Sequence, residues 1–468
     1  MKLAQESDRE TYRLIVPSLD GMELLLVHAN TRFLLPSVEI LHSQRVAESL
    51  TAAMKREWGH EVICLFAPDI AVPSGQPNGI RYQVVECRDR AMRVDARTQW
   101  VPISLLSQES FADSSDYLVV QRSLAECDAG ARGLAPGPFA TLGWFQQLYQ
   151  WVEEAIQPLN LQLSGCFRQF NASPSFSLIR FETNGPALWF KAVGKPNLRE
   201  FPVMLTLVQL FPKFVPPLLA KRPSWNGWLS PEIEGTNLGQ TRNIAQWEAA
   251  IVALARLQLA SVGRQAELLD AGARDLRTST LSNLVSPFLR AMGQLMEQQT
   301  NIPPPVLNQE ELLLLGGQIQ YALSVIEDLG IPETLGHLDP NPGNIIVSSD
   351  GCRFLDWAEA YVGYPLFSFE YLLEHLRRAV GTSTEVESQL TASYLEQWTR
   401  RLTPRQIREA VAVAPLLAAF AYAAGSDRWF DQERLRDDPI TTGYLRSLTR
   451  RMSCEGKRLI NWRTRCLA

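Results

Sequence analysis

The chain lacks several features that mark special classes of protein. Its seven cysteines never occur as a C-x-x-C pair, which argues against a structural zinc site and a disulfide framework and is typical of reduced thiols. Positive charge is not in excess either, with 45 lysines and arginines against 50 acidic residues and a formal net charge of -5. Binding to a phosphate backbone normally requires clustered positive charge. We therefore expect no nucleic-acid partner.

Long hydrophobic runs are also lacking. The first ten residues, MKLAQESDRE, do not contain the apolar core of a signal peptide. The longest apolar run, residues 410–425, is too short to span a bilayer comfortably and contains Pro415. We therefore predict a cytoplasmic protein without membrane contact, in which residues 410–425 form a buried helix. The sequence does not predict an oligomeric state.

What is present indicates a soluble α+β protein of more than one domain. The chain has 468 residues, of which 46% are apolar and 20% charged, so two or three packed cores are expected. Residues 11–125 alternate short apolar runs with turns and contain one helical stretch at 43–58. The Gly-, Pro- and Ala-rich segment 125–141 is the best linker candidate.

A second pattern begins after this segment. Residues 161–193 indicate a three-strand meander, and the chain becomes helical beyond about residue 237. Thr403, Pro404 and Gln406 predict the start of a helix with a capping box. These patterns give domains at residues 1–140, 141–235 and 236–468, with a small β-rich lobe preceding a large helical lobe.

The strongest chemical signal is the segment HLDPNPGNIIVSSDGCRFLDWAEA, residues 337–360. It places Asp339 five residues before Asn344, and Asp356 twelve residues after Asn344. A hairpin between Asn344 and Asp356 would bring Asp339, Asn344 and Asp356 to one edge of the hairpin. Phosphoryl transfer requires such a group, because a base must orient the attacking hydroxyl while oxygen ligands hold magnesium. The alternative is a polar surface loop that contains these residues by chance.

This segment resembles the catalytic loop of the aminoglycoside phosphotransferase and choline kinase family, which is related to protein kinases. The resemblance implies that Asp339 is the catalytic base and that His337 braces the loop. It also implies that Asn344 and Asp356 bind Mg2+, and Trp357 stands where protein kinases have phenylalanine. The expected fold of the C-terminal two thirds is therefore the bilobal protein-kinase-like fold.

A kinase also needs a lysine on an upstream strand to hold the nucleotide phosphates, and Lys191 in ALWFKAVG is the candidate. A buried lysine requires a partner, for which Glu200 on the following helix is the natural choice. Lys195 is the rival lysine, but it lies in a Gly-Lys-Pro-Asn turn. The alternative is that Lys191 projects to solvent from an edge strand.

Two further segments are expected to contact the nucleotide. Ser173 and Ser175 lie where the family has a flexible loop over the phosphates; the loop contains no glycine, and an ordinary hairpin turn is the alternative. Residues 228–238 resemble the family's hinge, so the backbone near Glu232 and Ile233 would meet the adenine.

Where the family commonly has Gly-Asp-Pro and a later aspartate, this chain has Gly363-Tyr364-Pro365 and Ser368. The support of the helix after the metal-binding loop is therefore expected to differ. No acidic set for a cationic acceptor is recognisable. The acceptor is expected to be a small hydroxylated molecule, and the sequence does not choose between ATP and GTP as phosphate donor.

The N-terminal domain resembles a degenerate Nudix domain, with Leu34-Leu35-Pro36 at the position of the family's Leu-Pro-Gly turn. Nudix hydrolysis needs several acidic residues on the following helix. This chain has Ala52, Ala53 and Arg56 there, and only Glu57 remains. One carboxylate cannot assemble the metal cluster, so we predict a non-catalytic domain. An unrelated small α/β domain is the alternative.

The sequence thus favours a small-molecule phosphotransferase that uses ATP or GTP and Mg2+. The second hypothesis is a kinase-like nucleotide-binding regulatory or scaffold protein without turnover. Hydrolysis of nucleotide pyrophosphates by the N-terminal domain is a third hypothesis, and the absence of metal ligands argues against it.

Overall fold

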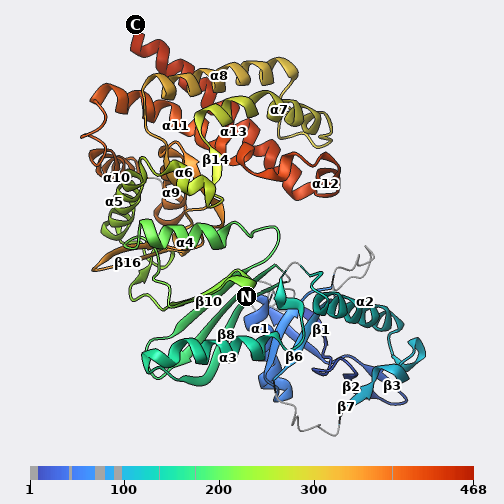
Figure 1. Ribbon diagram of the computed structural model, residues 1–468. Coiled ribbons are helices and arrows are strands. Elements are labelled where there is room, and N and C mark those ends of the chain that lie inside the picture. The colour runs from blue at the N-terminus through green and yellow to red at the C-terminus, as the bar shows by residue number, and fades with distance from the viewer. Residues whose placement is uncertain are drawn as a thin grey trace, which may run out of the picture. The chain divides into compact units, whose positions relative to one another are not determined.

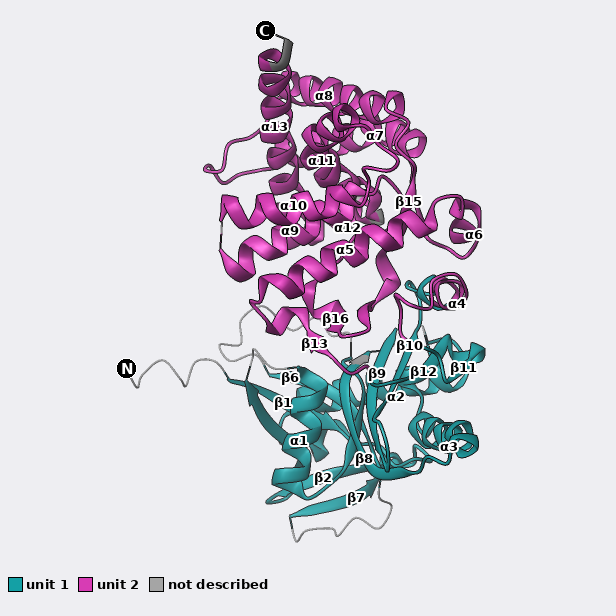
Figure 2. Ribbon diagram, turned by 90° about the vertical axis from the view of Figure 1, so that its left-hand side faces the viewer, with its two compact units in different colours: residues 1–201, 217–232 teal, residues 202–216, 233–468 magenta. Residues whose placement is uncertain are grey.

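A computed structural model shows a chain of mixed helix and strand that forms two compact units (Figures 1 and 2). The structure describes residues 9–41, 45–68, 80–88, 97–135, 137–173, 175–381 and 383–467. Unit 1 comprises residues 1–201 and 217–232, and unit 2 comprises residues 202–216 and 233–468. The domain boundaries expected from the sequence remain a prediction.

Unit 1 begins with two small sheets and one helix. The first sheet has the order β4-β1-β6-β5, with a parallel β1–β6 pair and antiparallel neighbours, and the second has the order β3-β2-β7. The strands are β1 (Arg9–Ile15), β2 (Glu23–Ala29), β3 (Arg32–Leu34), β4 (Ser37–Leu41), β5 (Val62–Phe66), β6 (Arg81–Cys87) and β7 (Thr98–Pro102).

Helix α1 (Val46–Trp58) lies between β4 and β5 in sequence and buries Leu50, Ala53 and Met54. It ends at Gly59, whose positive φ of 69° is readily adopted by glycine. The helix predicted for residues 43–58 is confirmed from Val46 onward, and Ser43 lies outside the described residues.

Helices α2 (Ser114–Ala131) and α3 (Trp144–Ile156) follow. The linker expected at residues 125–141 is wrong in its first half, because residues 125–131 are the last two turns of α2. Alanine favours a helix, Gly130 lies within α2, and Gly133, with φ 75°, comes only after the helix has ended. The segment also lies inside unit 1 and does not separate the two units.

The predicted meander is confirmed and extended to a five-stranded antiparallel sheet with the order β11-β12-β10-β9-β8. Its strands are β8 (Leu163–Ser173), β9 (Phe176–Thr183), β10 (Leu188–Val193), β11 (Ala220–Arg222) and β12 (Gly227–Pro231). Because successive side chains along a strand point to opposite faces, one face of this sheet is buried. In β10, Phe190 and Ala192 are fully buried, while Trp189 and Lys191 project to the other face.

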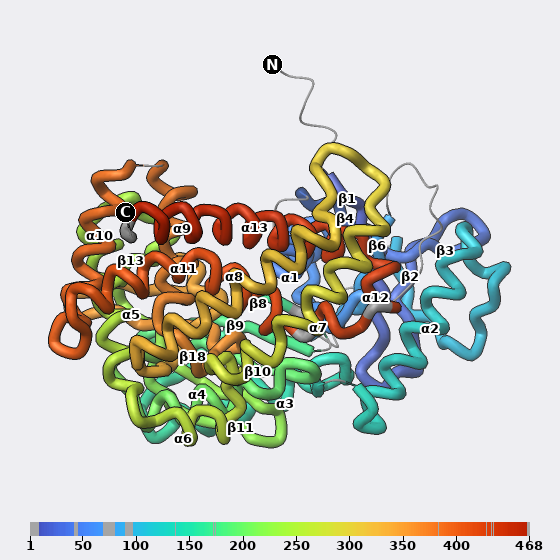
Figure 3. Tube along the Cα trace, turned by 90° about the horizontal axis from the view of Figure 1, so that it is seen from above, coloured from blue at the N-terminus to red at the C-terminus, as the bar shows by residue number. Residues whose placement is uncertain are grey.

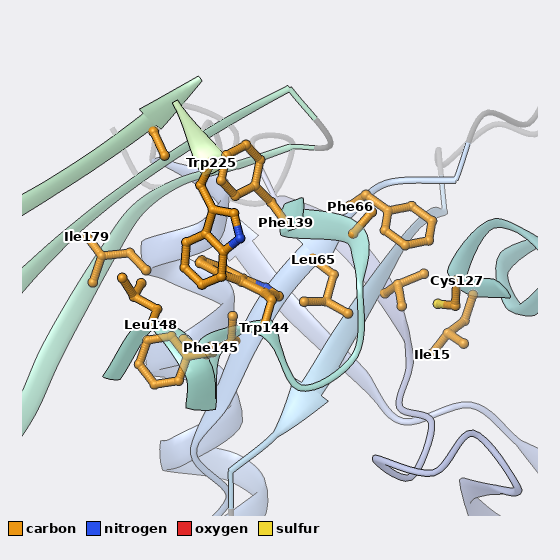
Figure 4. Close-up of a cluster of buried hydrophobic side chains, with 14 of the residues drawn as sticks. Ile15, Leu65, Phe66, Cys127, Phe139, Trp144, Phe145, Leu148, Ile179 and Trp225 are labelled. Atoms are coloured by element: carbon orange, nitrogen blue, oxygen red, sulfur yellow. The ribbon is translucent and has the colours of Figure 1, made fainter. Parts of the chain in front are cut away.

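One hydrophobic core joins the N-terminal strands to this sheet (Figure 4). Trp144 of α3 lies at its centre and makes edge-to-face contacts with Phe139 and Trp225, at ring-centroid distances of 5.6 and 6.2 Å. Ile15 and Leu65 from the first sheet belong to the same cluster. Residues before and after position 140 therefore share a core.

Unit 2 is mostly helical, as the sequence predicts beyond residue 237. Helix α4 (Glu200–Leu210) crosses the boundary between the units, and α8, α11 and α13 pack side by side (Figure 3). The helices are α5 (Ile244–Ser261), α6 (Gln265–Asp270), α7 (Thr278–Glu297), α8 (Gln309–Asp328), α9 (Leu366–Val380), α10 (Thr384–Glu396), α11 (Pro404–Gly425), α12 (Gln432–Asp437) and α13 (Pro439–Leu467).

Two small sheets complete unit 2, with the orders β13-β16-β17 and β14-β18-β15. Their strands are β13 (Thr236–Asn237), β14 (Arg274–Leu276), β15 (Thr334–His337), β16 (Ile345–Ser348), β17 (Gly351–Phe354) and β18 (Ala360–Gly363). The hairpin expected in the catalytic segment is β16–β17, so this prediction is confirmed.

Helix α11 begins as predicted, because Thr403 and Gln406 form a reciprocal capping box with Pro404 in the first turn. By length and composition alone α11 could cross a membrane, but 61% of its most apolar window is buried inside the protein. Burial of this kind is typical of a core helix, which agrees with the expectation for residues 410–425.

Candidate active site

The residues singled out in the segment 337–356 lie at one end of the two small sheets of unit 2. His337 ends β15, Asn344 ends the short 3-10 turn η7 (Pro342–Asn344), and Asp356 follows β17. Asp339 and Asp356 are exposed, whereas Asn344 is half-buried. The Leu355 amide donates to the Asn344 carbonyl at 2.8 Å. The β16–β17 pairing thus brings Asn344 next to Leu355, the residue before Asp356.

The His337 ring joins the two aspartate-bearing segments. Its Nδ1 lies 3.1 Å from the backbone nitrogen of Asp339, and its Nε2 lies 3.2 Å from the carbonyl oxygen of Leu355. Because an amide N–H can only donate, Nδ1 must accept, and the ring proton belongs on Nε2, which donates to Leu355. Burial lowers the pKa of the His337 imidazole. A neutral imidazole in this one tautomer therefore fixes the backbone at Asp339 and beside Asp356.

A second layer of contacts holds His337 in place. The His337 amide donates to the Ser368 hydroxyl at 2.8 Å, and the Tyr361 hydroxyl lies 3.0 Å from the same oxygen. Trp357 packs on the imidazole at a centroid distance of 5.0 Å. The sequence drew attention to Ser368 only as a departure from the family pattern. In the structure its hydroxyl accepts the hydrogen bond that ties α9 to the loop.

Asp356 has a left-handed backbone conformation, with φ 60° and ψ 64°. Few non-glycine residues adopt it, although aspartate and asparagine do so more readily than most. Such local strain is concentrated at functional sites. The conformation turns the chain sharply between β17 and the 3-10 turn η8 (Trp357–Glu359).

Lys191 and Glu200, which the sequence marks as candidates for phosphate binding, both lie in unit 1. The Lys191 ammonium bonds to the Glu200 carboxylate, and the two side chains are 12% and 3% exposed. Lys191 also lies over the rings of Phe176 and Trp228, 5.2 and 5.8 Å from their centroids. Lys195, the rival lysine, is exposed. The structure thus pairs Lys191 with the partner expected from the sequence.

The two serines lie at the tip of the β8–β9 hairpin. Ser173 ends β8, and its hydroxyl oxygen is 3.3 Å from that of Ser175. The Gly194 amide, just beyond β10, donates to the Ser175 carbonyl at 2.7 Å. The hairpin tip is therefore tied to the strand that carries Lys191.

The predicted hinge coincides with the boundary between the units, which falls between Glu232 and Ile233. The Glu232 side chain accepts two hydrogen bonds from Arg180, at 3.0 and 2.7 Å, which lower its pKa. Its backbone amide already donates to the Ala187 carbonyl. Only the carbonyl of Glu232 and the backbone of Ile233 therefore remain as candidate contacts for a base. Gly235, with φ 149°, approaches Val347 so closely that a side chain would collide with its carbonyl.

Two residues on distant helices were missed by the sequence analysis. Burial lowers the pKa of His375 on α9 and raises that of Tyr422 on α11, and the charge of Asp339 acts on both groups. No local sequence signal relates these two residues to Asp339.

Comparison with known proteins gives a family for part of the chain. Residues 225–409 match the model of the phosphotransferase enzyme family. No curated protein sequence matches the chain.

Several solved structures match this chain at low sequence identity. An ethanolamine kinase from Plasmodium vivax is 13% identical, with a TM-score of 0.43 over 65% of this chain and 86% of that one. The choline kinase LicA from Streptococcus pneumoniae is 13% identical, with a TM-score of 0.42 over 67% of this chain and 99% of that one. A putative aminoglycoside phosphotransferase from Ralstonia eutropha is 15% identical, with a TM-score of 0.43 over 69% and 98%.

The match at residues 225–409 contains His337, Asp339, Asn344 and Asp356. The part of the chain that matches the phosphotransferase enzyme family model thus includes the whole candidate catalytic segment.

Proposed function

We propose that the protein transfers the γ-phosphate of ATP or GTP to a hydroxyl group of a small molecule. In this proposal Asp339 is the base that orients the acceptor hydroxyl. Lys191 neutralises charge on the donor phosphates, and Asn344 and Asp356 hold magnesium. Such a reaction requires positioning and electrostatic stabilisation more than covalent chemistry by the protein.

The observation that carries the proposal is the double contact of the His337 ring. One imidazole holds the Asp339 amide and the Leu355 carbonyl at the same time. The backbone of the proposed base and that of the residue next to the proposed metal ligand are therefore fixed relative to each other. A surface loop without chemistry has no need of a buried, neutral histidine to fix it.

The oxygen donors fit magnesium. Magnesium usually takes one or two protein carboxylates and completes its shell with water and substrate phosphates. The Asp356 carboxylate and the Asn344 amide oxygen are such ligands. Within the described part of the chain, no group of three or more His, Cys, Asp and Glu side chains could hold a metal ion. The ion would therefore be shared with the nucleotide, and when bound it would neutralise charge on the transferred phosphate.

The acceptor side is proposed to include His375 and Tyr422, because the charge of Asp339 acts on both groups. Burial lowers the pKa of His375, which favours a neutral imidazole able to accept or donate a hydrogen bond. Tyr422 contributes a hydroxyl group and an aromatic face, and its ring lies 4.8 Å from that of Tyr371. An imidazole, a hydroxyl group and an aromatic ring would together suit a hydroxylated molecule with an apolar portion.

The direct test is transfer of labelled phosphate from ATP or GTP to pools of sugars, amino alcohols and other hydroxylated metabolites, with and without Mg2+. We expect magnesium-dependent product that disappears in Asp339→Asn. Asp350→Asn is the matched control, because Asp350 is an exposed aspartate in the β16–β17 turn. Nucleotide binding without transfer to any pool, unchanged by Asp339→Asn, would instead support a kinase-like regulatory protein.

A further inference from the structure

Gln169 on β8 joins the five-stranded sheet to the first N-terminal sheet. Its Nε2 donates to the Cys64 carbonyl and its Oε1 accepts from the Cys64 amide, both at 2.9 Å. The side chain is 1% exposed. A side-chain amide thus makes the pair of hydrogen bonds that a neighbouring strand would otherwise make to this residue.

Each strand at this junction is the edge of its own sheet. β5 ends the order β4-β1-β6-β5, and β8 ends the order β11-β12-β10-β9-β8. Edge strands present unpaired backbone groups, which folded proteins satisfy or cover. Gln169 covers one such pair at Cys64. The two sheets are therefore connected by hydrogen bonds as well as by the apolar core.

Both strands are irregular at the junction. In β8 the register shifts between Gln169 and Asn171, so Phe170 is an extra residue. In β5 the register shifts between Cys64 and Phe66. Bulges redirect a strand and re-aim the side chains beyond them. The Gln169 bonds thus fix β8 at the point where its course changes.

Phe170, the bulged residue, is held from several sides. The guanidinium of Arg45, at the start of α1, lies 5.1 Å from its ring centroid, and that of Arg168 lies 5.0 Å away. Its ring packs on Trp189 of β10 at 4.8 Å. Trp189 is two residues before Lys191 and therefore lies on the same face of the sheet.

The hairpin tip begins four residues beyond Gln169. Ser173 pairs with Phe176 there, and Ser175 is bound by Gly194. One continuous set of contacts therefore runs from Cys64 through Gln169 and Phe170 to the hairpin and to β10. The N-terminal part of the chain lies at one end of this set, and the proposed phosphate contacts lie at the other.

We propose that Gln169 is a positioning residue, through which the N-terminal sheet holds the β8–β9 hairpin ready to bind nucleotide phosphates. This inference rests on the proposed function for its nucleotide part. It gives the N-terminal region a role that requires no catalytic residues of its own. Loss of the Gln169 bonds would free the hairpin to leave its binding arrangement.

The test compares Gln169→Leu with Gln83→Leu in the full-length chain. Gln83 lies on β6, is also buried, and its side-chain amide donates to the adjacent Val84 carbonyl. It therefore controls for the loss of a buried amide from the same unit. Hydrogen exchange at residues 170–178 and the Kd for a non-hydrolysable ATP or GTP analogue with Mg2+ are measured on each protein, with Lys191→Ala in parallel.

We expect Gln169→Leu to speed hydrogen exchange in the β8–β9 hairpin and to raise the Kd for the nucleotide analogue about tenfold. A tenfold rise corresponds to a hairpin that holds its binding arrangement in roughly a tenth of the molecules. Gln83→Leu should leave both unchanged. Phe170→Leu, a milder change at the bulge, should act in the same direction if Gln169→Leu does not fold. Unchanged exchange and Kd in a folded Gln169→Leu protein would overturn the inference.

The two proposals fail in different ways. If the wild type binds the analogue and Lys191→Ala weakens binding, the nucleotide site stands, and the Gln169 variant alone decides the inference. If the wild type binds neither analogue, the proposed function and the nucleotide part of the inference both fail. The exchange rates still decide whether Gln169 orders the hairpin.

Discussion

Lys191 and Glu200 are nine residues apart in the sequence and form an ion pair in which both side chains are nearly hidden from solvent. Such a pair contributes little net stability compared with apolar residues, but loss of one partner is costly because a buried charge loses its counter-charge. Lys191 lies on the central strand β10 and Glu200 lies at the start of α4. The pair therefore suits a role in binding rather than in folding.

We expect Lys191→Met to lower the free energy of unfolding of unit 1 by about 3 kcal/mol or more, because the cation beside the Glu200 carboxylate is removed. Denaturant unfolding followed by tryptophan fluorescence measures this change. The double variant Lys191→Met/Glu200→Leu should regain most of the loss. Lys195→Met, at an exposed lysine nearby, is the control. Equal destabilisation by Lys191→Met and Lys195→Met would contradict the prediction.

Asp339→Asn should separate turnover from nucleotide affinity. The carboxylate is proposed to orient the acceptor hydroxyl, so we expect kcat to fall by about 10²–10⁴-fold. The nucleotide Kd should stay within a few-fold, because Asp339 does not hold the base. Both quantities are measured on one preparation, and near-wild-type turnover would refute the assignment of Asp339 as base.

Asp356→Ala should weaken nucleotide binding only when magnesium is present, because it removes a proposed charged metal ligand. Calorimetric titrations with Mg2+ and with EDTA give the comparison. Asp356→Asn is the control for the backbone, since asparagine also tolerates the left-handed conformation that alanine disfavours. Affinity that falls equally with and without Mg2+ would point to a loss of folding instead.

Glu86 gives a prediction about pH. Burial raises the pKa of its carboxyl group to about 7, against 4.5 for an unperturbed glutamate, although the Gly143 amide donates to it. The folded state therefore binds this proton more tightly than the unfolded state. Its stabilising contribution is complete below about pH 4.5 and is lost as the pH rises through 7.

We expect Glu86→Gln to remove this dependence, which amounts to roughly 3 kcal/mol between pH 4.5 and 7.5. Unfolding free energies of both proteins across that range provide the measurement. Glu370 in unit 2 also has a pKa raised to about 7 by burial, so the comparison is the difference between the two proteins. Parallel pH curves would show that Glu86 titrates normally.

We predict no diphosphate hydrolase activity from the N-terminal region. On α1, Glu57 is exposed and paired with Arg56, and Ala53 is buried. These residues do not supply the carboxylates that such a metal cluster needs. The full-length Asp339→Asn protein, assayed with dinucleotides and nucleotide sugars, should release no product that depends on Mg2+. Turnover that is lost on a further Glu57→Gln change would restore the hydrolase hypothesis.

The sequence determined the local features of this protein. Alternating apolar residues specify β8, β9 and β10, and Thr403 with Gln406 specifies the start of α11, because these signals act over a few residues. The spacing of Asp339, Asn344 and Asp356 singled out the candidate catalytic segment, and a lysine within an apolar strand singled out Lys191 as a candidate phosphate contact. Each of these predictions used contacts between near neighbours in the chain.

Only the tertiary structure decided what lies beside these residues. The bond from His337 to Leu355, the support from Ser368, and the Gln169 bonds to Cys64, 105 residues away, depend on how strands and helices pack. A histidine, a serine and a glutamine carry no sequence signal that names their partners. The resemblance of the N-terminal region to a Nudix domain stays a prediction for the same reason, since short apolar strands fit many packings and only long-range contacts select one.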